Sequence, residues 1–341
     1  MKVLIIGGAG FIGANTASRF MKKGHEVTVF DNLSRRGTKW NLEYLKKEGP
    51  VKFVKGDVRK YQDLVNLFKK DKNYDAVIHL AAQVAVTTSV TNPREDFEIN
   101  ALGTFNVLEA IRGAKINPAV LYSSTNKVYG GMTDIKITER NGRYEYESLP
   151  DGIAEERLLD FHSPYGCSKG TADQYMIDYS RIYGLRTAVF RQSCIYGYRQ
   201  FGIEDQGWVA WFTIAAMLGK PLTVYGDGKQ VRDVLFIEDL IDGYEAAIAN
   251  IDKIKGNAFN VGGGAKNTMS LLELLSFLEK FFGKKIPVKY GGWRPGDQPV
   301  FVCDIAKAKK EFGWEPKTVP EEGVKKLYEW VKHNKQLFED M

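Results

Sequence analysis

Tyr165 and Lys169 are the two residues of this chain best suited to acid–base chemistry. They open a predicted helix over residues 164–183, and side chains four residues apart on a helix lie on the same face. A neighbouring ammonium lowers the pKa of a phenol from its ordinary value of about 10. We therefore expect Tyr165 to exchange a proton with a substrate at neutral pH. Tyr-x-x-x-Lys is also common by chance, so an ordinary surface pair is the alternative.

Strand and helix patterns alternate along the first half of the chain and must position this pair. Helical patterns, including residues 13–23 and 97–112, separate five short apolar segments. These expected strands are residues 3–7, 26–31, 51–57, 76–81 and 119–124. The alternation predicts an α/β fold, a Rossmann-type doubly wound parallel sheet with helices on both faces. Ligands bind beyond the carboxyl ends of the strands in such a sheet, so the residues that follow each strand are site candidates.

The alternation loosens after residue 190. The elements expected there are a helix at 208–218, strands at 233–237 and 257–261, and a helix at 270–282. We expect residues 1–190, with about 234–262, to form the first domain. We expect residues 191–233 and 263–341 to form a smaller C-terminal α/β domain that binds substrate. This boundary depends on whether 234–262 rejoins the first domain.

A glycine-rich turn joins the first predicted strand to its helix. Its sequence, Gly7-Gly-Ala-Gly10-Phe-Ile-Gly13, permits a tight turn, close approach of the backbone to a pyrophosphate, and close packing of helix on strand. The helix N-terminus offers free N–H groups to phosphate. A glycine pattern alone is also found in ordinary strand–helix turns. Here Asp31 ends the next strand about 20 residues on, as in dinucleotide-binding folds.

Asp31 also bears on which dinucleotide the first domain binds. A carboxylate at this position accepts hydrogen bonds from ribose hydroxyls and repels a 2′-phosphate, which favours NAD. Arg35 and Arg36 follow closely and are able to grip a phosphate, so NADP stays open. Asp57 ends the third strand where an adenine ring would lie, although it could instead cap its loop. The expected NAD contacts are Gly7, Gly10, Phe11, Ile12, Gly13, Asp31, Asn32, Ser34, Arg35, Asp57, Val58, Leu80, Ala81, Ala82, Gln83, Asn100, Ser123, Tyr165 and Lys169.

Hydroxyl groups end the fifth predicted strand, in the sequence Tyr122-Ser-Ser-Thr125. A hydroxyl at this edge can hydrogen-bond the substrate oxygen that gains or loses a proton. Capping of the strand end is the alternative, above all for Ser123.

Together these features resemble the extended short-chain dehydrogenase/reductase family, the nucleotide-sugar epimerases and dehydratases. The resemblance covers nearly the whole chain, and it implies that Thr125 acts with Tyr165 and Lys169 in catalysis. It also implies that Arg232 and Arg294 hold a nucleotide diphosphate, with a structural salt bridge as the alternative for each. The motifs that carry it are His79-Leu-Ala-Ala82, Phe97-Glu-Ile-Asn100, Val128-Tyr-Gly130, Arg232-Asp233 and Arg294-Pro-Gly-Asp297.

The two residues after Thr125 bear on the reaction. In this family the reaction begins with transfer of a hydride from a sugar C–H to the nicotinamide. Dehydratases of the family then use an Asp-Glu pair directly after the Ser/Thr, whereas this chain has Asn126 and Lys127. Dehydration is therefore disfavoured. We expect epimerisation, in which the ketone takes the hydride back on its other face.

A narrower resemblance concerns the carbon that is inverted. The segments 83–89, 123–130, 162–170 and 228–234 are similar to those of family members that invert C2 of a CDP-hexose. The 2-hydroxyl proton would then pass to Tyr165. Many relatives carry Asn at the position of Cys194, which leaves that contact open, and plain loop roles are open for Thr87, Thr88 and Gln206. The expected substrate contacts are Thr87, Thr88, Ser124, Thr125, Asn126, Cys194, Gln206, Arg232, Arg294 and Asp297.

Composition excludes several other classes of protein. The 341 residues are 44% hydrophobic and 26% charged, which is a normal globular balance. Three widely spaced cysteines, Cys167, Cys194 and Cys303, predict neither disulfides nor a metal site, and a reducing cytoplasm fits them. We expect no signal peptide and no membrane span. The net charge of +6 comes from scattered lysines, so we expect a solvated surface and no nucleic-acid partner.

Two other functions stay open at this stage. One is a C4 epimerase or another oxidoreductase of UDP- or GDP-sugars. The other is a non-catalytic NAD-sensing regulator on the same fold, although such a protein would not need both Tyr165 and Lys169. The family resemblance also implies a homodimer, formed through residues 97–112 and 164–183.

Overall fold

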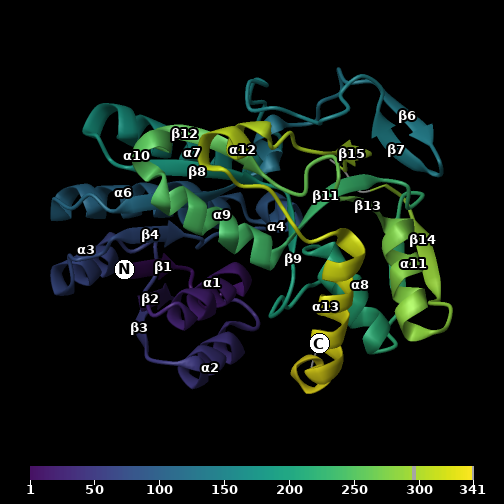
Figure 1. Cartoon of the computed structure of the whole chain (residues 1–341), viewed down its shortest axis with the longest axis horizontal. Helices are drawn as coiled ribbons and strands as arrows, with labels where there is room; N and C mark the ends of the chain where they lie inside the picture. Colours follow the sequence, from purple (N-terminus) through teal and green to yellow (C-terminus); the bar gives the residue numbers. More distant parts are fainter. Residues whose placement is uncertain (294–296, 340–341) are drawn as a thin grey trace.

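A seven-stranded parallel sheet forms the centre of the molecule, with helices on both faces (Figure 1). The structure is a computed structural model that describes residues 1–293 and 297–339. All six neighbouring strand pairs of this sheet are parallel. The predicted doubly wound α/β fold is therefore confirmed. The strands in spatial order are β12 (Asn257–Val261), β8 (Thr187–Gln192), β5 (Ala119–Thr125), β4 (Ala76–His79), β1 (Lys2–Ile6), β2 (Glu26–Asp31) and β3 (Val51–Lys55).

Apolar side chains bury both faces of this sheet. In β1, Val3 and Ile5 belong to one buried cluster, whereas Leu4 and Ile6 belong to another. Such continuous apolar runs are typical of strands that helices cover on both sides. The helices that cover the large sheet in the first cluster include α1 (Phe11–Lys22), α2 (Thr38–Glu48) and α9 (Ile237–Ala249), and those in the second include α3 (Tyr61–Lys70), α6 (Gly103–Ala114) and α7 (Ser163–Tyr183).

The helix expected over residues 97–112 differs in the structure. A short helix, α5 (Pro93–Phe97), precedes one π-helical turn, η1 (Glu98–Leu102), and α6 then continues to Ala114. Asn92 caps α5, and Pro93 starts it. The π-turn carries Asn100, whose side chain bonds Gln83 of the neighbouring loop, a residue distant in the chain. Single π-turns of this kind often occur at functional sites.

A second group of strands and helices lies beyond the carboxyl edge of the large sheet (Figure 1). Strand β11 pairs with three short strands, and β10 pairs with β14. The strands are β9 (Cys194–Tyr196), β10 (Leu222–Tyr225), β11 (Val231–Phe236), β13 (Thr268–Ser270), β14 (Val288–Gly291) and β15 (Val300–Phe301), with the hairpin β6 (Ile137–Arg140) and β7 (Arg143–Tyr146) beside them. The remaining helices are α4 (Val86–Thr91), α8 (Trp208–Met217), α10 (Ile251–Ile254), α11 (Leu271–Phe282), α12 (Ala306–Phe312) and α13 (Pro320–His333), with 3-10 turns η2 (Asn126–Tyr129) and η3 (Lys335–Phe338).

The chain crosses between these two parts after β11. Residues 234–236 still pair with β9 in the second group, whereas α9 packs against α1 and β12 joins the large sheet. We propose the expected division into two domains, with the return to the first domain beginning at α9 instead of at residue 234. No helix of the described chain is long and apolar enough to cross a bilayer.

Candidate active site

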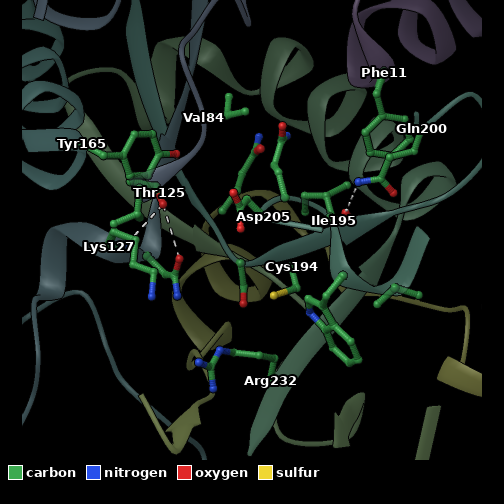
Figure 2. Close-up of a pocket in the computed structure, with 18 of the residues that line it drawn as sticks. Phe11, Val84, Thr125, Lys127, Tyr165, Cys194, Ile195, Gln200, Asp205 and Arg232 are labelled. Atoms are coloured by element: carbon green, nitrogen blue, oxygen red, sulfur yellow. Dashed lines mark hydrogen bonds between the residues drawn. The ribbon is translucent and has the colours of Figure 1, made fainter. Parts of the chain in front are cut away.

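A cavity of about 440 Å³ lies between the carboxyl edge of the large sheet and the second group of strands. Figure 2 shows side chains from both sides pointing into it, with Tyr165 and Thr125 on one wall and Cys194 and Arg232 on another. It therefore combines the loops expected to bind a dinucleotide with those expected to bind a substrate. Its lining includes Phe11, Ile12, Leu80, Ala82, Thr87, Ser123, Ser124, Thr125, Asn126, Lys127, Tyr165, Lys169, Gln192, Cys194, Gln206, Trp208, Arg232 and Asp297.

The glycine-rich turn has the geometry that a dinucleotide requires. Gly7 has a φ of +82°, and a Cβ there would lie 2.5 Å from the backbone nitrogen of Ala81. A Cβ on Gly13 would lie 2.4 Å from the carbonyl oxygen of Gly7, so α1 could not approach the turn. At Gly10 a Cβ would meet only that same oxygen, at 3.2 Å. Gly10 is the N-cap of α1 and has no side chain to cap the helix. The N–H groups of the first turn of α1 therefore suit a pyrophosphate.

Asp31 lies at the end of β2 and is 7% exposed. Its carboxylate accepts hydrogen bonds from the backbone N–H of Ala9, at 3.0 Å, and of Leu33, at 2.8 Å. Burial raises the pKa of Asp31, although these two bonds partly offset the effect. The carboxylate is thus fixed beside the glycine-rich turn, at the place where a ribose would bind.

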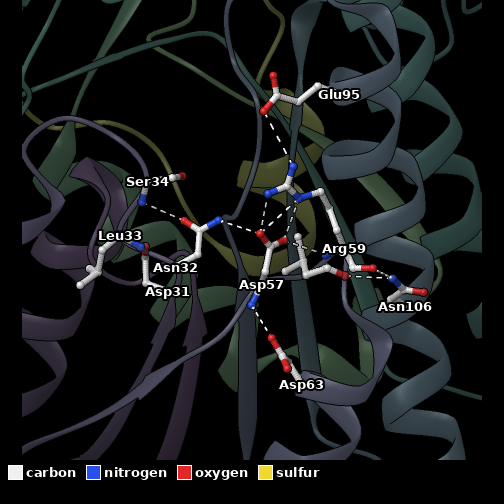
Figure 3. Close-up of polar contacts among 10 residues, drawn as sticks. Asp31, Asn32, Leu33, Ser34, Asp57, Arg59, Asp63, Glu95 and Asn106 are labelled. Carbon is white, nitrogen blue, oxygen red and sulfur yellow. Dashed lines mark hydrogen bonds and ion pairs between the residues drawn. The ribbon is translucent and has the colours of Figure 1, made fainter.

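The loop after β3 is held by an ionic cluster (Figure 3). Arg59 donates to both oxygens of Asp57, at 2.7 to 3.2 Å, and Asn32 donates to the same carboxylate at 3.1 Å. Burial opposes ionisation of Asp57, but the hydrogen bonds from Arg59 and Asn32 outweigh it and lower the pKa to about 2. These contacts correspond to the loop-capping alternative for Asp57. Ser34 donates its backbone N–H to Asn32, and Val58 is buried behind the cluster.

Asn100 acts on the loop after β4 and does not reach the cavity. It is 1% exposed, accepts from the backbone N–H of Gln83 at 2.9 Å, and donates to the Gln83 carbonyl at 3.1 Å. It also donates to Asp96 and Ser168. In the structure Asn100 therefore holds the backbone of Gln83 in place. The direct cofactor contact expected for Asn100 stays a prediction.

Arg35 connects the two sides of the cavity. Its guanidinium donates to the side-chain oxygen of Gln206 and, at 3.5 Å, to the carbonyl of Ala82. A residue expected to contact NAD thus bonds a residue expected to contact substrate.

The three expected catalytic side chains meet on one wall of the cavity. Thr125 ends β5, and Tyr165 and Lys169 occupy successive turns at the start of α7. All three are buried. The Lys169 ammonium donates to the carbonyl oxygen of Ser123 and lies 4.3 Å from the centre of the Tyr122 ring. The Ser123 hydroxyl donates to Gln192 at 3.0 Å, which agrees with its strand-capping alternative.

Burial shifts the pKa values of Tyr165 and Lys169 on this wall. It raises the pKa of Tyr165 to about 12, although the Thr125 hydroxyl lowers it in part. It also lowers the pKa of Lys169 to about 7. The expectation that Lys169 lowers the phenol pKa is therefore wrong for this structure. The reason is that both groups are desolvated and the ammonium bonds the Ser123 carbonyl.

Most expected substrate residues line the cavity, but two have other surroundings. Thr87 lines it, whereas Thr88 is exposed and does not, because only one face of the short helix α4 is turned inward. The Ser124 hydroxyl lines the wall but donates to Asp173 at 2.8 Å, and Asp173 also pairs with Arg191. Asn126, Cys194, Gln206, Arg232 and Asp297 line the cavity, and Arg294 lies outside the described residues.

Several lining residues were missed from the sequence. Lys127 follows the catalytic strand, so its position near the site was recognisable, but its side chain was not expected to face the cavity. Gln192, Trp208 and Gln230 also line it, although the sequence did not single them out as contacts. Burial raises the pKa of the Cys194 thiol, with Arg232 as the main opposing charge, so Cys194 presents a neutral thiol to the cavity.

Comparison with known proteins places this geometry in a family. The profile of the GDP-mannose 4,6-dehydratase family matches residues 4–327. CDP-paratose 2-epimerase of Salmonella typhi is 50% identical over 336 residues, which are 97% of this chain and 99% of that protein. UDP-glucose 4-epimerase of Thermotoga maritima, solved with UDP-glucose, superposes with a TM-score of 0.84 at 29% identity and covers 98% of this chain and 99% of its own.

A further solved structure contains both kinds of ligand. UDP-glucuronic acid 4-epimerase of Bacillus cereus, in complex with UDP-glucuronic acid and NAD, superposes with a TM-score of 0.83 at 29% identity. It covers 98% of this chain and 100% of its own. The matching profile, the full-length relatives and the dinucleotide geometry agree with one another. The chain therefore belongs to the NAD-dependent nucleotide-sugar epimerase and dehydratase family, the extended short-chain dehydrogenases/reductases.

Proposed function

We propose that this protein inverts the configuration at C2 of a CDP-hexose, of the CDP-paratose and CDP-tyvelose type. The observation that carries the proposal is the 50% identity, over nearly both full lengths, to a CDP-paratose 2-epimerase. A UDP-glucose 4-epimerase of Mycolicibacterium smegmatis shares 30% with this chain over a similar length. The preference for CDP-paratose-type chemistry thus rests on a clear difference in identity.

The residues of the catalytic wall suit the proton transfers of this reaction. NAD, when bound, supplies the hydride acceptor and donor and a positive charge in the site. Tyr165 and Thr125 are the groups of this chain placed to exchange a proton with the 2-hydroxyl and to hold its oxygen. The Thr125 hydroxyl is already oriented, because it accepts from the backbone N–H of Lys127 and donates to Asn126, each at 3.3 Å.

At the two positions after Thr125, where dehydratases of the family carry an acid and a base, this wall has no carboxylate. Asn126 does not ionise, and Lys127 follows it. Across the cavity, Arg232 provides a guanidinium that would suit a diphosphate, since arginine binds such groups through paired hydrogen bonds. The site is therefore suited to a nucleotide diphosphate sugar that is epimerised without elimination.

Product analysis tests the proposal directly. The purified protein is incubated separately with CDP-paratose, CDP-glucose and UDP-glucose, and the products are identified by NMR. We expect C2 inversion of a CDP-hexose. Inversion of UDP-glucose at C4 would instead support the alternative of a C4 epimerase. NAD binding with no turnover of any nucleotide sugar would support a non-catalytic regulator.

We also propose a homodimer formed through α6, α7 and the π-turn before α6. Four large apolar side chains on the π-turn and α7 are exposed, namely Leu102, Tyr175, Ile182 and Tyr183, and Phe97 at the end of α5 is exposed beside the π-turn. A second copy of the chain would cover them, as exposed apolar groups of this kind favour association. Sedimentation should therefore give the mass of a dimer, and Ile182→Glu should shift it toward a monomer. An unchanged mass for the variant would reject this surface.

A cytoplasmic location is the third proposal. The three cysteines, Cys167, Cys194 and Cys303, are all free in the structure. Free thiols in this number suit a reducing compartment. Fractionation of cells that produce the protein should recover it with cytoplasmic markers, and recovery with secreted or periplasmic markers would contradict the proposal.

A further inference from the structure

Lys127 is a charged residue of the cavity wall to which the catalytic scheme gives no role. Its side chain lines the cavity between the end of β5 and the second group of strands (Figure 2). Among the described residues, its side chain has one hydrogen bond, 3.3 Å long, to the neutral amide oxygen of Gln298. Gln298 is itself 5% exposed and is fixed by donating to the Gly130 carbonyl at 2.5 Å.

The ammonium of Lys127 has more donors than this one contact uses. A lysine ammonium carries three N–H donors, so the Gln298 bond leaves two for another acceptor. Burial lowers the pKa of Lys127 to about 8, and the charge of Arg232 contributes to the lowering. Lys127 is half-buried, and withdrawing a cation from water is costly unless its donors meet acceptors. The cavity is the space from which that acceptor would come.

The position of Lys127 along the cavity indicates which part of a substrate it meets. Its backbone N–H bonds Thr125, at the end where the proton is exchanged. Its side chain is influenced by Arg232, the cation placed for a diphosphate, and by Asp297. In a nucleotide sugar the hexose ring carries both the reacting carbon and, at C1, the bond to the diphosphate. Lys127 therefore lies at the level of the hexose.

We propose that Lys127, anchored by Gln298, is a specificity-determining residue that donates hydrogen bonds to oxygen atoms of the hexose in a nucleotide sugar. This proposal rests on the proposed function in that it assumes a nucleotide-sugar ligand. It does not depend on which carbon is inverted. Under this proposal, the hydrogen bonds of Lys127 make a nucleotide sugar bind more tightly than the nucleoside diphosphate without the sugar.

Equilibrium binding of two probes tests this assignment. The NAD-loaded wild type and Lys127→Met are titrated calorimetrically with CDP and with CDP-glucose. Loss of a hydrogen bond to a charged donor lowers affinity about 10-fold or more. We expect the Kd of CDP-glucose to rise by about this factor in Lys127→Met, while the Kd of CDP stays within about twofold. Lys289→Met, a change at an exposed lysine on β14, is the matched control and should alter neither value.

Each other outcome overturns the assignment. Equal weakening of CDP and CDP-glucose would show that Lys127 binds the diphosphate. No change with either probe, or equal affinity of the wild type for both, would remove its role in sugar recognition. Retention of NAD and an unchanged Tm show that Lys127→Met is folded, and Lys127→Arg provides a second variant that keeps the charge. Failure of the proposed function would appear separately, as a wild type that binds CDP-glucose but does not invert C2 of CDP-paratose.

Discussion

The two sides of the cavity are built in different ways. On the cofactor side, the surface comes from short turns directly after β1, β2 and β4. Backbone groups and glycines largely determine its shape. On the substrate side, single side chains from segments far apart in the chain converge, such as Lys127, Cys194, Arg232 and Asp297. The first kind of site tolerates few changes in backbone shape, whereas the second kind can change its specificity through individual side chains.

The wall that joins the two sides should show the largest effect. Tyr165→Phe removes the proton donor and acceptor, and loss of general acid–base catalysis lowers rates by about 10²–10⁴-fold. We expect turnover of the nucleotide sugar to fall by this factor, while the purified variant still contains NAD. Turnover is measured by NMR and the nucleotide content by release and chromatography. Unchanged turnover would reject the role of Tyr165.

Two glycines of the same turn should separate the shaping of the fold from the binding of cofactor. Gly13→Ala places a Cβ 2.4 Å from the Gly7 carbonyl oxygen, so we expect a loss of stability of about 1–3 kcal/mol. Gly10→Ala meets only one atom, at 3.2 Å, and should leave the Tm nearly unchanged. It should still weaken NAD binding about tenfold, or ~1.4 kcal/mol, because the Cβ lies where the pyrophosphate approaches.

Thermal unfolding and NAD titration of both variants check this contrast. Equal losses of stability in Gly13→Ala and Gly10→Ala would contradict the separate roles given to the two glycines. Unchanged NAD affinity in Gly10→Ala would show that the pyrophosphate does not approach this residue.

The ionic cluster around Asp57 should give the smallest effect, and one that depends on pH. The pKa of Asp57 is lowered from 3.8 to about 2 in the folded protein. Its stabilising contribution is therefore present above pH 3.8 and is lost as the pH falls through 2. Since Arg59 is 36% exposed, we expect Asp57→Asn to cost only about 1 kcal/mol at pH 7. The difference from the wild type should shrink below pH 4, as measured by urea unfolding. A difference that grows at low pH would contradict this account.

The contrast between the two sides also explains what the sequence could predict. The strands of the first half and the glycine-rich turn follow local rules, so their positions could be predicted within a few residues. The π-turn before α6 could not, because it depends on the distant contact between Asn100 and Gln83. The error on the Tyr165 pKa has a similar cause, since helical spacing does not reveal burial or the bond from Lys169 to Ser123.

The substrate side was only partly predictable for the same reason. Arg232 was found because it belongs to a motif that the family shares, and Cys194 because it stands where many relatives carry Asn. Thr88 does not line the cavity, and sequence spacing does not show which face of α4 is turned inward. Trp208 at the start of α8 and Gln230 just before β11 reach the cavity because these elements pack beyond the large sheet, and a sequence pattern does not show that packing.

The most direct test of the central claim uses CDP-paratose labelled with deuterium at C2. The proposed reaction removes the C2 hydride and returns it to the other face of the same sugar. We therefore predict CDP-tyvelose that retains deuterium at C2, formed more slowly than from unlabelled substrate. Inversion at C4 with the C2 deuterium undisturbed, or no inversion of CDP-paratose while UDP-glucose is epimerised, would contradict the assignment of this protein as a CDP-hexose 2-epimerase.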